Sequence, residues 1–324
     1  MTQIHSGWRI ERYQPAMAAE WNRFVAASRN ATFLFNRSYM DYHSDRFDDC
    51  SWLAFKGGAL RALLPADIAC DDASGEKVLR SHGGLSYGGW ILPGAHLDGG
   101  DLLDIFEAAT DTWRSEGIAR LDYKPLPPIY AARPSEEDIY ALFRMGGRLS
   151  EVHLSATIDL RCPGVFNQQQ RRHLAKASAL PIAVEETGNI PEFMDMLTAC
   201  LRERHDLVPV HTAAEMQLLT SRFPENIKFY VSRLDGIAHA GVCVYDSGIV
   251  AHAQYIATTP EGRRLNLLTP LFHWLITERY AERRYFDFGI SDEDHGLYLN
   301  RGLNRQKTSY GATATAFLRY TLDL

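Results

Sequence analysis

The sequence has few cysteines, and they follow no recognisable pattern. The five are Cys50, Cys70, Cys162, Cys200 and Cys243, an odd number spread widely over 324 residues. None belongs to a CxxC pair or to a Cys/His spacing typical of metal ligands. This argues against a structural zinc and favours a reducing compartment.

Long hydrophobic runs and an excess of basic charge are also missing. The first twelve residues contain no apolar signal region, and no stretch of about 18 apolar residues follows. The net charge of −6 gives no overall attraction to nucleic acid or to an anionic membrane. We therefore expect a cytoplasmic protein without a membrane span, for which nucleic acid is an unlikely partner.

An internal repeat is the main organising feature of the chain. A strand, a Gly-containing turn and a second strand are predicted at residues 51–68 and again at 228–245. A helix and a strand follow at 101–124 and again at 268–289, and Asp287 falls where Asp122 falls in the first copy. A repeat of this length predicts two copies of one α/β domain, at residues 1–150 and 151–324.

The most informative stretch is residues 250–291. It is predicted to form a strand, a loop with Gly262, Arg263 and Arg264, an apolar helix, and a second strand that ends in a polar loop. A Gly/Arg loop that leads into a helix N-terminus offers backbone N–H groups and positive potential to a phosphate. An ordinary strand-to-helix connection would show the same pattern.

Two polar residues on the predicted strands are candidates for proton transfer. Asp287 lies between Phe286 and Phe288 and points to the opposite face, so it either acts as a base or orients an amine, or it caps a loop. His252 shares a strand face with Gln254, opposite to Tyr255, and is either a proton relay or a structural histidine.

A polar cluster follows the last core strand. Asn300, Arg305 and Lys307 would suit an anionic acceptor, because guanidinium and ammonium groups bind phosphate well. Solvated surface is the alternative interpretation of each.

Several stretches resemble a known family. The order of elements at residues 250–289 resembles the acyl-CoA-binding core of the GCN5-related N-acetyltransferase (GNAT) fold. The tandem repeat, together with Gln306-Lys-Thr-Ser-Tyr-Gly311, resembles the FemAB-type branch with its Lys-x-x-aromatic-Gly motif. The stretches Tyr39-Met-Asp-Tyr-His-Ser-Asp-Arg-Phe47 and Phe286-Asp-Phe-Gly-Ile-Ser291 are similar to a bacterial GNAT subgroup found beside surface-polysaccharide genes.

The resemblance implies a mixed-sheet α/β fold of two GNAT-like domains, with acetyl-CoA or another acyl-CoA bound by the second domain and no metal. It implies a cofactor site at Tyr255, Ile256, Thr258, Gly262, Arg263, Arg264, Leu265 and Asn266. The loop departs from the family pattern, because Arg-Arg-Leu-Asn follows Gly262 without a second small residue. The matching loop of the first copy, residues 92–100, has no arginine, so we expect the first domain to lack a CoA site.

The resemblance also implies roles near the reacting groups. Tyr298 lies where many members keep a tyrosine that protonates the departing thiolate, although packing beside Leu297 and Leu299 is the alternative. Together with Asp287 and His252, it completes the predicted catalytic set. The predicted acceptor-binding residues are Gln254, Ser291, Asn300, Arg305 and Lys307.

The resulting functional hypothesis is an acyl-CoA-dependent N-acyltransferase. Its acceptor would be a small-molecule or glycan-precursor amine, such as an amino sugar in surface-polysaccharide synthesis, and the amine would attack directly in a ternary complex. One alternative is a Fem-like aminoacyl transferase that uses aminoacyl-tRNA; another is a non-catalytic ligand-binding protein. The sequence leaves the oligomeric state open.

Overall fold

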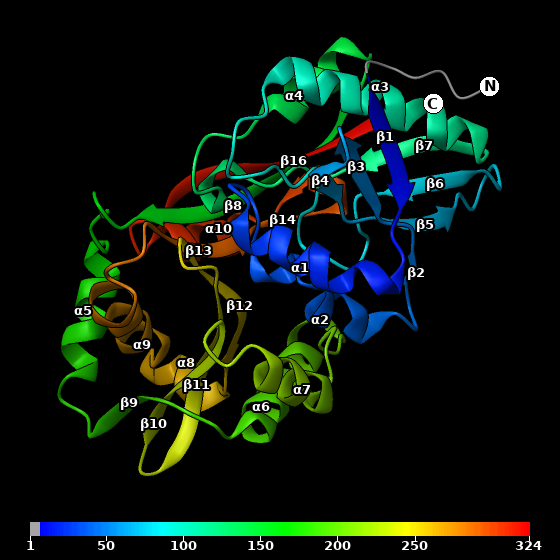
Figure 1. Cartoon of the computed structure of the whole chain (residues 1–324). Helices are drawn as coiled ribbons and strands as arrows, with labels where there is room; N and C mark the ends of the chain where they lie inside the picture. The colour runs from blue at the N-terminus through cyan, green and yellow to red at the C-terminus, as the bar shows by residue number, and fades with distance from the viewer. Residues whose placement is uncertain (1–6) are drawn as a thin grey trace. The chain divides into compact units, whose positions relative to one another are not determined.

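The protein is described by a computed structural model that covers residues 7–324, apart from the side chains at positions 204 and 205. The chain forms two compact units. Unit 1 contains residues 7–153 of the described chain together with 316–324, and unit 2 contains residues 154–315. Each unit combines helices with strands of both directions (Figure 1), which confirms the expected mixed α/β class.

Unit 1 contains the strands β2, β5, β6, β7 and β16, which neighbour one another in that order, and a separate three-stranded sheet in the order β1-β3-β4. Its main elements are β1 (Trp8–Arg12), α1 (Ala18–Ala27), α2 (Arg37–Met40), β2 (Asp48–Asp49), β3 (Trp52–Lys56), β4 (Ala59–Leu64), β5 (Asp67–Cys70), β6 (Lys77–Arg80), α3 (Gly99–Ser115), β7 (Ile118–Tyr123), α4 (Glu137–Arg144) and β16 (Thr313–Asp323). β8 (Arg148–Asp159) starts in unit 1 and continues into unit 2.

The core of unit 1 forms where α3 covers the sheet. Trp52, Trp90 and Trp113 are buried there, together with Phe106 of α3. The predicted hairpin turn at Gly57 and Gly58 is confirmed, with both residues at positive φ as a tight turn requires. This hairpin joins β3 to β4 in the smaller sheet, so the strand that pairs with β6 on the outer side is β5.

Unit 2 is built on strands in the order β8-β13-β12-β11-β10-β9. Its elements after β8 are α5 (Gln168–Ala177), β9 (Ile182–Glu186), α6 (Ile190–His205), α7 (Ala213–Arg222), β10 (Ile227–Leu234), β11 (Ile237–Asp246), β12 (Val250–Thr258), α8 (Pro260–Leu265), α9 (Leu268–Trp274), the π-helical turn η5 (Leu275–Arg279), β13 (Tyr285–Ile290), β14 (Asp292–Glu293), η6 (Asp294–Gly296), β15 (Tyr298–Leu299) and α10 (Arg301–Thr308). α5 and α9 lie side by side (Figure 1).

β12 and β13 form a fork. They are parallel, and their pairing covers only Val250 with Tyr285, Ala251 with Phe286, and His252 with Asp287. Along the rest of both strands, within the part of the chain that the structure describes, no further pairs join them. The edge of β12 that faces β13 therefore opens after His252 and leaves backbone groups available to a ligand.

The same position exists in unit 1. There the parallel strands β6 and β7 pair Arg80 with Asp122, in the register in which β12 and β13 pair His252 with Asp287. The predicted correspondence of Asp122 and Asp287 is thus present in the strand register, although an arginine replaces the histidine.

Two local expectations are wrong. The predicted Gly/Arg loop is the short helix α8, because Thr259 caps it and Pro260 occupies its first turn. The predicted alternation along β12 breaks at a bulge, where Ala253 pairs with Val244 and Tyr255 with Cys243. As a result Ile256, rather than Tyr255, packs with Ala251 and Ala253 in the core of unit 2.

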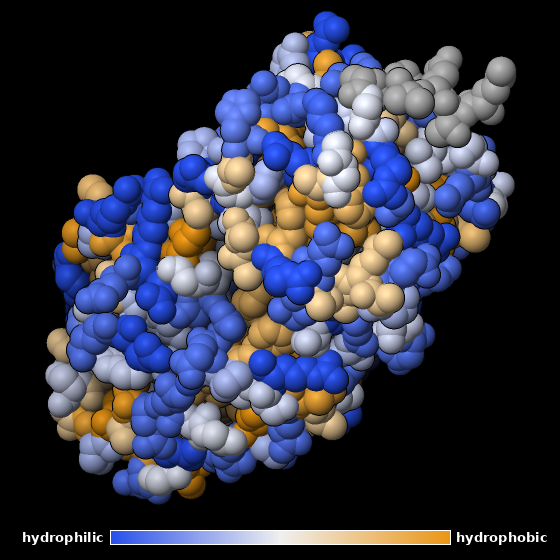
Figure 2. All heavy atoms as spheres, viewed as in Figure 1, coloured by the Kyte–Doolittle hydropathy of each residue, from blue (hydrophilic) through white to orange (hydrophobic). Residues whose placement is uncertain are grey.

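Polar and charged residues interrupt the apolar ones over the face shown in Figure 2. Among residues 7–324, no helix combines the length and the apolar composition required to cross a bilayer.

Candidate functional site

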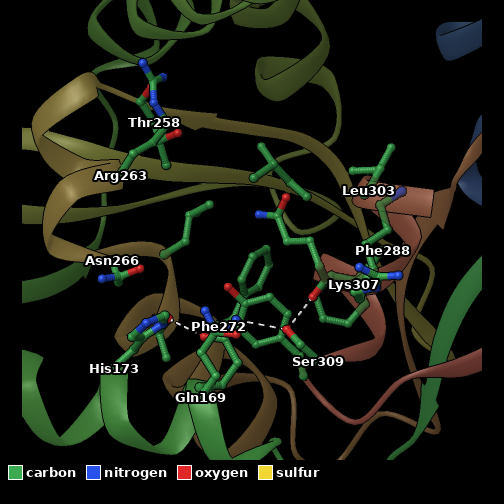
Figure 3. Close-up of a pocket in the computed structure, with 18 of the residues that line it drawn as sticks. Gln169, His173, Thr258, Arg263, Asn266, Phe272, Phe288, Leu303, Lys307 and Ser309 are labelled. Carbon is green, nitrogen blue, oxygen red and sulfur yellow. Dashed lines mark hydrogen bonds between the residues drawn. The ribbon is translucent and has the colours of Figure 1, made fainter. Parts of the chain in front are cut away.

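A pocket of about 540 Å³ lies in unit 2 beside the fork. Ile256 and Thr258 of β12 and Phe288 of β13 contribute to its wall, so the pocket borders the part of the fork where the two strands no longer pair. Figure 3 shows Thr258, Arg263 and Asn266 on one side of it, and Leu303 and Lys307 on the other. The apolar part of the lining includes Leu201, Ile256, Leu268, Phe272, Phe288 and Leu303.

The charged groups of the pocket are of one sign. Arg263, Arg305, Lys307 and His173 line it. Among the described residues that line the pocket, none is an aspartate or a glutamate. Amides and hydroxyls supply the remaining polar groups, among them Asn167, Gln169, Gln170, Asn266, Thr269, Gln306 and Ser309. The lining therefore favours an anionic ligand.

The cations differ in how they are held. Arg263 donates to the carbonyl of Thr258 at 3.1 Å and forms an ion pair with Glu203 at 2.6 Å. The Lys307 ammonium donates to the carbonyl of Gly289 at 2.9 Å and also to that of Ile290. Burial lowers the pKa of Lys307 to about 8, although the charges of Asp287 and Asp292 favour its protonated form. Arg305 has no ion-pair partner among the described residues.

The residues at the fork form a hydrogen-bonded pair. The Nδ1 atom of His252 lies 2.8 Å from Oδ2 of Asp287. The other oxygen of Asp287 accepts hydrogen bonds from the hydroxyls of Ser155 and Thr157, both on β8. The two residues predicted for proton transfer, His252 and Asp287, therefore lie in direct contact, whereas neither lines the pocket itself.

α5 supplies a wall of the pocket that the sequence did not indicate. Gln170 donates from Nε2 to the Ser309 hydroxyl at 2.9 Å and accepts from the Thr269 hydroxyl at 2.7 Å. It thereby joins α5 to α9 and to the segment after α10. The signal for it in the sequence is the run of amides at Asn167–Gln170.

The pocket brings seven of the sequence-predicted site residues together: Ile256, Thr258, Gly262, Arg263, Asn266, Arg305 and Lys307. The predicted free N–H groups are partly engaged, since Gly262 donates to the Thr259 hydroxyl and Arg263 to the Thr259 carbonyl. Tyr310 of the Lys-x-x-aromatic-Gly motif also lines the pocket, stacked on Phe288.

The other predicted residues lie outside the lining. Arg264 pairs with Glu261 on the surface, and Leu265 packs against the core of unit 2. The Tyr255 hydroxyl bonds His211, and Gln254 lies at the bulge.

Three further predicted residues belong to the segment between β13 and α10. Ser291 is buried, and its backbone N–H bonds the carbonyl of Leu154. Asn300 caps α10 through its side chain. Tyr298 is 59 % exposed and lies on the β14–β15 hairpin.

A separate group in unit 1 has the composition of a metal site. His96, Asp98 and Asp101 come within coordinating distance of one another. However, Asp98 caps α3 and Asp101 accepts a hydrogen bond from Lys56, so both carboxylates already have structural roles.

Comparison with known proteins defines the class of this protein. Residues 167–295, which contain most of the pocket, match the family described as acetyltransferase (GNAT) domain. A search of curated proteins gave no significant match. The fold is that of two tandem GNAT-like domains, and the match over residues 167–295 supports an N-acyltransferase enzyme.

The more particular likeness is to FemAB-like structures. FemX has a TM-score of 0.71 at 11 % identity, over 98 % of this chain and 97 % of that one. The C-terminal domain of a putative lysylphosphatidylglycerol synthetase from Agrobacterium fabrum has a TM-score of 0.61 at 14 % identity, over 96 % and 92 %. L-PGS from Bacillus licheniformis has a TM-score of 0.58 at 13 % identity, over 97 % and 93 %. At such identities the likeness concerns the fold.

Proposed function

We propose that the protein transfers an acyl group, acetyl by default, from acyl-CoA to an amine. The donor would bind in the unit 2 pocket, and the amine would attack the thioester directly, as no cysteine lies in a nucleophile context. Cys200, the cysteine that lines the pocket, is buried on α6. An acyl-CoA donor would place the reaction in the cytoplasm.

The observation that carries this proposal is the charge of the pocket lining. Arginines, a lysine and neutral amides suit the phosphates of CoA, because guanidinium and amide groups donate hydrogen bonds to phosphate oxygens. An aminoacyl donor would bring an α-ammonium next to its ester. A buried ammonium requires a carboxylate or several carbonyl acceptors, and the lining offers no carboxylate.

The fork provides the second element. Pantetheine is an extended chain with two amide groups, which can bond the open edge of β12 as an additional strand would. Ile256 and Thr258 lie on that edge strand, with Arg263 and Asn266 at the end where the pyrophosphate would bind. The thioester would then lie toward the His252–Asp287 pair and Lys307, and these groups would handle the protons of the reaction.

The acceptor we propose is an amino sugar, free or linked to a nucleotide or lipid, in surface-polysaccharide synthesis. Arg305 supports an acceptor with a phosphate, because its guanidinium is exposed at the pocket and lacks an ion pair among residues 7–324. The polysaccharide context rests on the resemblance of the sequence motifs.

A second candidate function is aminoacyl transfer from aminoacyl-tRNA. The observation in its favour is the similarity to FemX over nearly the whole of both chains, together with the position of Lys307 and Tyr310 in the pocket. A non-catalytic ligand-binding protein is the third candidate.

Calorimetry and mass spectrometry with acetyl-CoA test the leading proposal. We expect binding, followed by release of free CoA thiol when amino sugars and their nucleotide-linked forms are added. Absence of CoA binding at about 1 mM would contradict the proposal, since productive donors bind in the micromolar to millimolar range. Retention of tRNA that weakens with rising salt would favour the second candidate instead.

A further inference from the structure

His252 and Asp287 occupy a defined point of the fold. They are the last pair in the register of β12 and β13 before the strands separate. A side chain at this point is held by the sheet on one side and borders the opened fork on the other. The pair is therefore fixed by the backbone at the place where the proposed thioester and amine would meet.

Asp287 is an unsuitable partner for the amine itself. Its side chain is 0 % exposed, whereas that of His252 is 18 % exposed. Oδ1 of Asp287 accepts from Ser155 Oγ at 2.5 Å, from Thr157 Oγ1 at 3.1 Å and from the Gly289 N–H at 3.3 Å. Oδ2 faces His252. These donors fix the carboxylate in one orientation and stabilise its charged form.

This orientation determines the tautomer of His252. A carboxylate oxygen can only accept a hydrogen bond, so Nδ1, at 2.8 Å from it, must carry the proton. The other ring nitrogen, Nε2, then has a lone pair. A histidine whose Nδ1–H bonds a buried carboxylate is held in one orientation, with Nε2 able to accept a proton.

The Nε2 edge of the ring lies against the segment that holds Lys307. A β-carbon at Gly289 would be 3.3 Å from Cε1 of His252 and 4.0 Å from Nε2. The carbonyl of the same glycine accepts the hydrogen bond from Lys307, which lines the pocket. Gly289 therefore connects the imidazole to the proposed donor site.

We infer that His252 Nε2 takes the proton from the acceptor ammonium, and that Asp287, Ser155 and Thr157 are positioning residues for it. The inference rests on the proposed acyl transfer. The neutral amine attacks the thioester carbon, the new C–N bond forms and the C–S bond breaks. The second amine proton leaves with the sulfur as thiol, and His252 returns the first proton to solvent.

Unit 1 supports this division of roles. At the equivalent register position Arg80 faces Asp122, and the Arg80 guanidinium bonds Asp67 instead. Asp122 accepts from Arg120. The first copy thus keeps a carboxylate at the equivalent register position, but an arginine stands where unit 2 has the proposed base.

The test combines an NMR measurement with kinetics. In the full-length protein, ¹⁵N shifts of the histidine rings report the tautomer, and the signals of His252 are assigned by their loss in His252→Gln. We expect Nδ1–H in the wild type. In Asp287→Asn, the donors from Ser155, Thr157 and Gly289 should hold the amide oxygen in the position of Oδ1. The NH₂ group then points toward His252 and donates to Nδ1. The ring proton of His252 must therefore be on Nε2.

The variants of the pair and of its supporting hydroxyls should differ in kcat. Asp287→Asn and His252→Gln should each lower kcat by about 100-fold or more with KM for acetyl-CoA within about twofold, as expected for loss of a general base. Ser155→Ala combined with Thr157→Val should lower kcat by about tenfold, since the carboxylate remains. The control is Asp159→Asn, which removes a carboxylate on the same strand that bonds Arg161, and should leave kcat unchanged.

An Nε2–H imidazole in the wild type, or an Asp287→Asn variant with kcat within about threefold, would overturn the inference. The tautomer can be measured without any substrate. An Nδ1–H imidazole in a protein that binds no acyl-CoA would therefore reject the proposed donor and still support the pair.

Discussion

Gly262 of α8 lies directly against the backbone of His239 on β11. A β-carbon at position 262 would stand 2.8 Å from the carbonyl carbon of His239 and closer still to its oxygen. The φ angle of Gly262 is not in the positive region, so the requirement for glycine here comes from this close approach alone. It fixes α8, and with it Arg263, to the sheet at one end of the pocket.

Gly262→Ala should therefore move α8 away from β11. We expect a loss of about 1–3 kcal/mol of unfolding free energy, as in other overpacked sites, together with weaker acyl-CoA binding. The matched control is Gly302→Ala in α10, where a β-carbon meets only the Asn300 side chain at 3.6 Å. That variant should be neutral or more stable by about 0.5–1 kcal/mol. Denaturant titration of both variants makes the comparison, and equal stabilities would contradict it.

Arg263 and its neighbour Arg264 provide a test of the donor site. Arg263→Gln should weaken acetyl-CoA binding about tenfold, because a charge-assisted hydrogen bond to phosphate is lost. Arg264→Gln removes the same charge from the adjacent residue, whose guanidinium bonds Glu261 outside the pocket, and should change Kd by less than about twofold. Calorimetry measures both. An equal effect of the two substitutions would indicate a general electrostatic influence rather than a contact.

Deprotonation of Lys307 should contribute to the pH dependence of the unfolding free energy. The folded protein loses the Lys307 proton at about pH 8, whereas the unfolded chain keeps it until about pH 10.5. The unfolded state thus binds more protons between these values, and stability from this group rises with pH across the interval. We expect the rise to be about 1–3 kcal/mol smaller in Lys307→Met. The measurement is denaturant unfolding at pH 7.5 to 10.5, and parallel curves for the two proteins would disprove the assignment.

Titration of Asp138 in unit 1 should change stability in the opposite direction, so that stability falls as the pH rises. Burial raises the pKa of its carboxyl to about 7 from 3.8, despite the hydrogen bond from the Tyr123 hydroxyl. The folded state therefore binds more protons between about pH 4 and 7, and the stability from this group is lost as the pH rises. Asp138→Asn should flatten the pH dependence of thermal unfolding in that interval. An unchanged dependence would show that the carboxyl titrates normally.

The sequence predicted the positions that depend on local pattern. Asp287 points away from Phe286 and Phe288, as alternation along a strand requires, and the turn at Asp235-Gly236 forms with both residues at positive φ. The tandem repeat also predicted that Asp287 corresponds to Asp122, and the two residues occupy equivalent register positions.

What the sequence did not predict depends on contacts between distant segments. Ser155 and Thr157 approach Asp287 only because β8 pairs with β13, more than a hundred residues further along the chain. α5 lines the pocket because it packs on α9. The bulge at Gln254 follows from the pairing with β11, and no residue in the strand marks it.

The return of the chain to unit 1 has a consequence for biosynthesis. Strand β16 pairs with β7 through residues 320–323, which are synthesised about two hundred residues after β7 itself. While the ribosome makes unit 2, the edge of β7 lacks this neighbour, and an unpaired strand edge readily pairs with other chains. Folding of the first copy can be completed only after synthesis of the second, so shortening the chain before residue 316 should expose nascent protein to aggregation and chaperone capture.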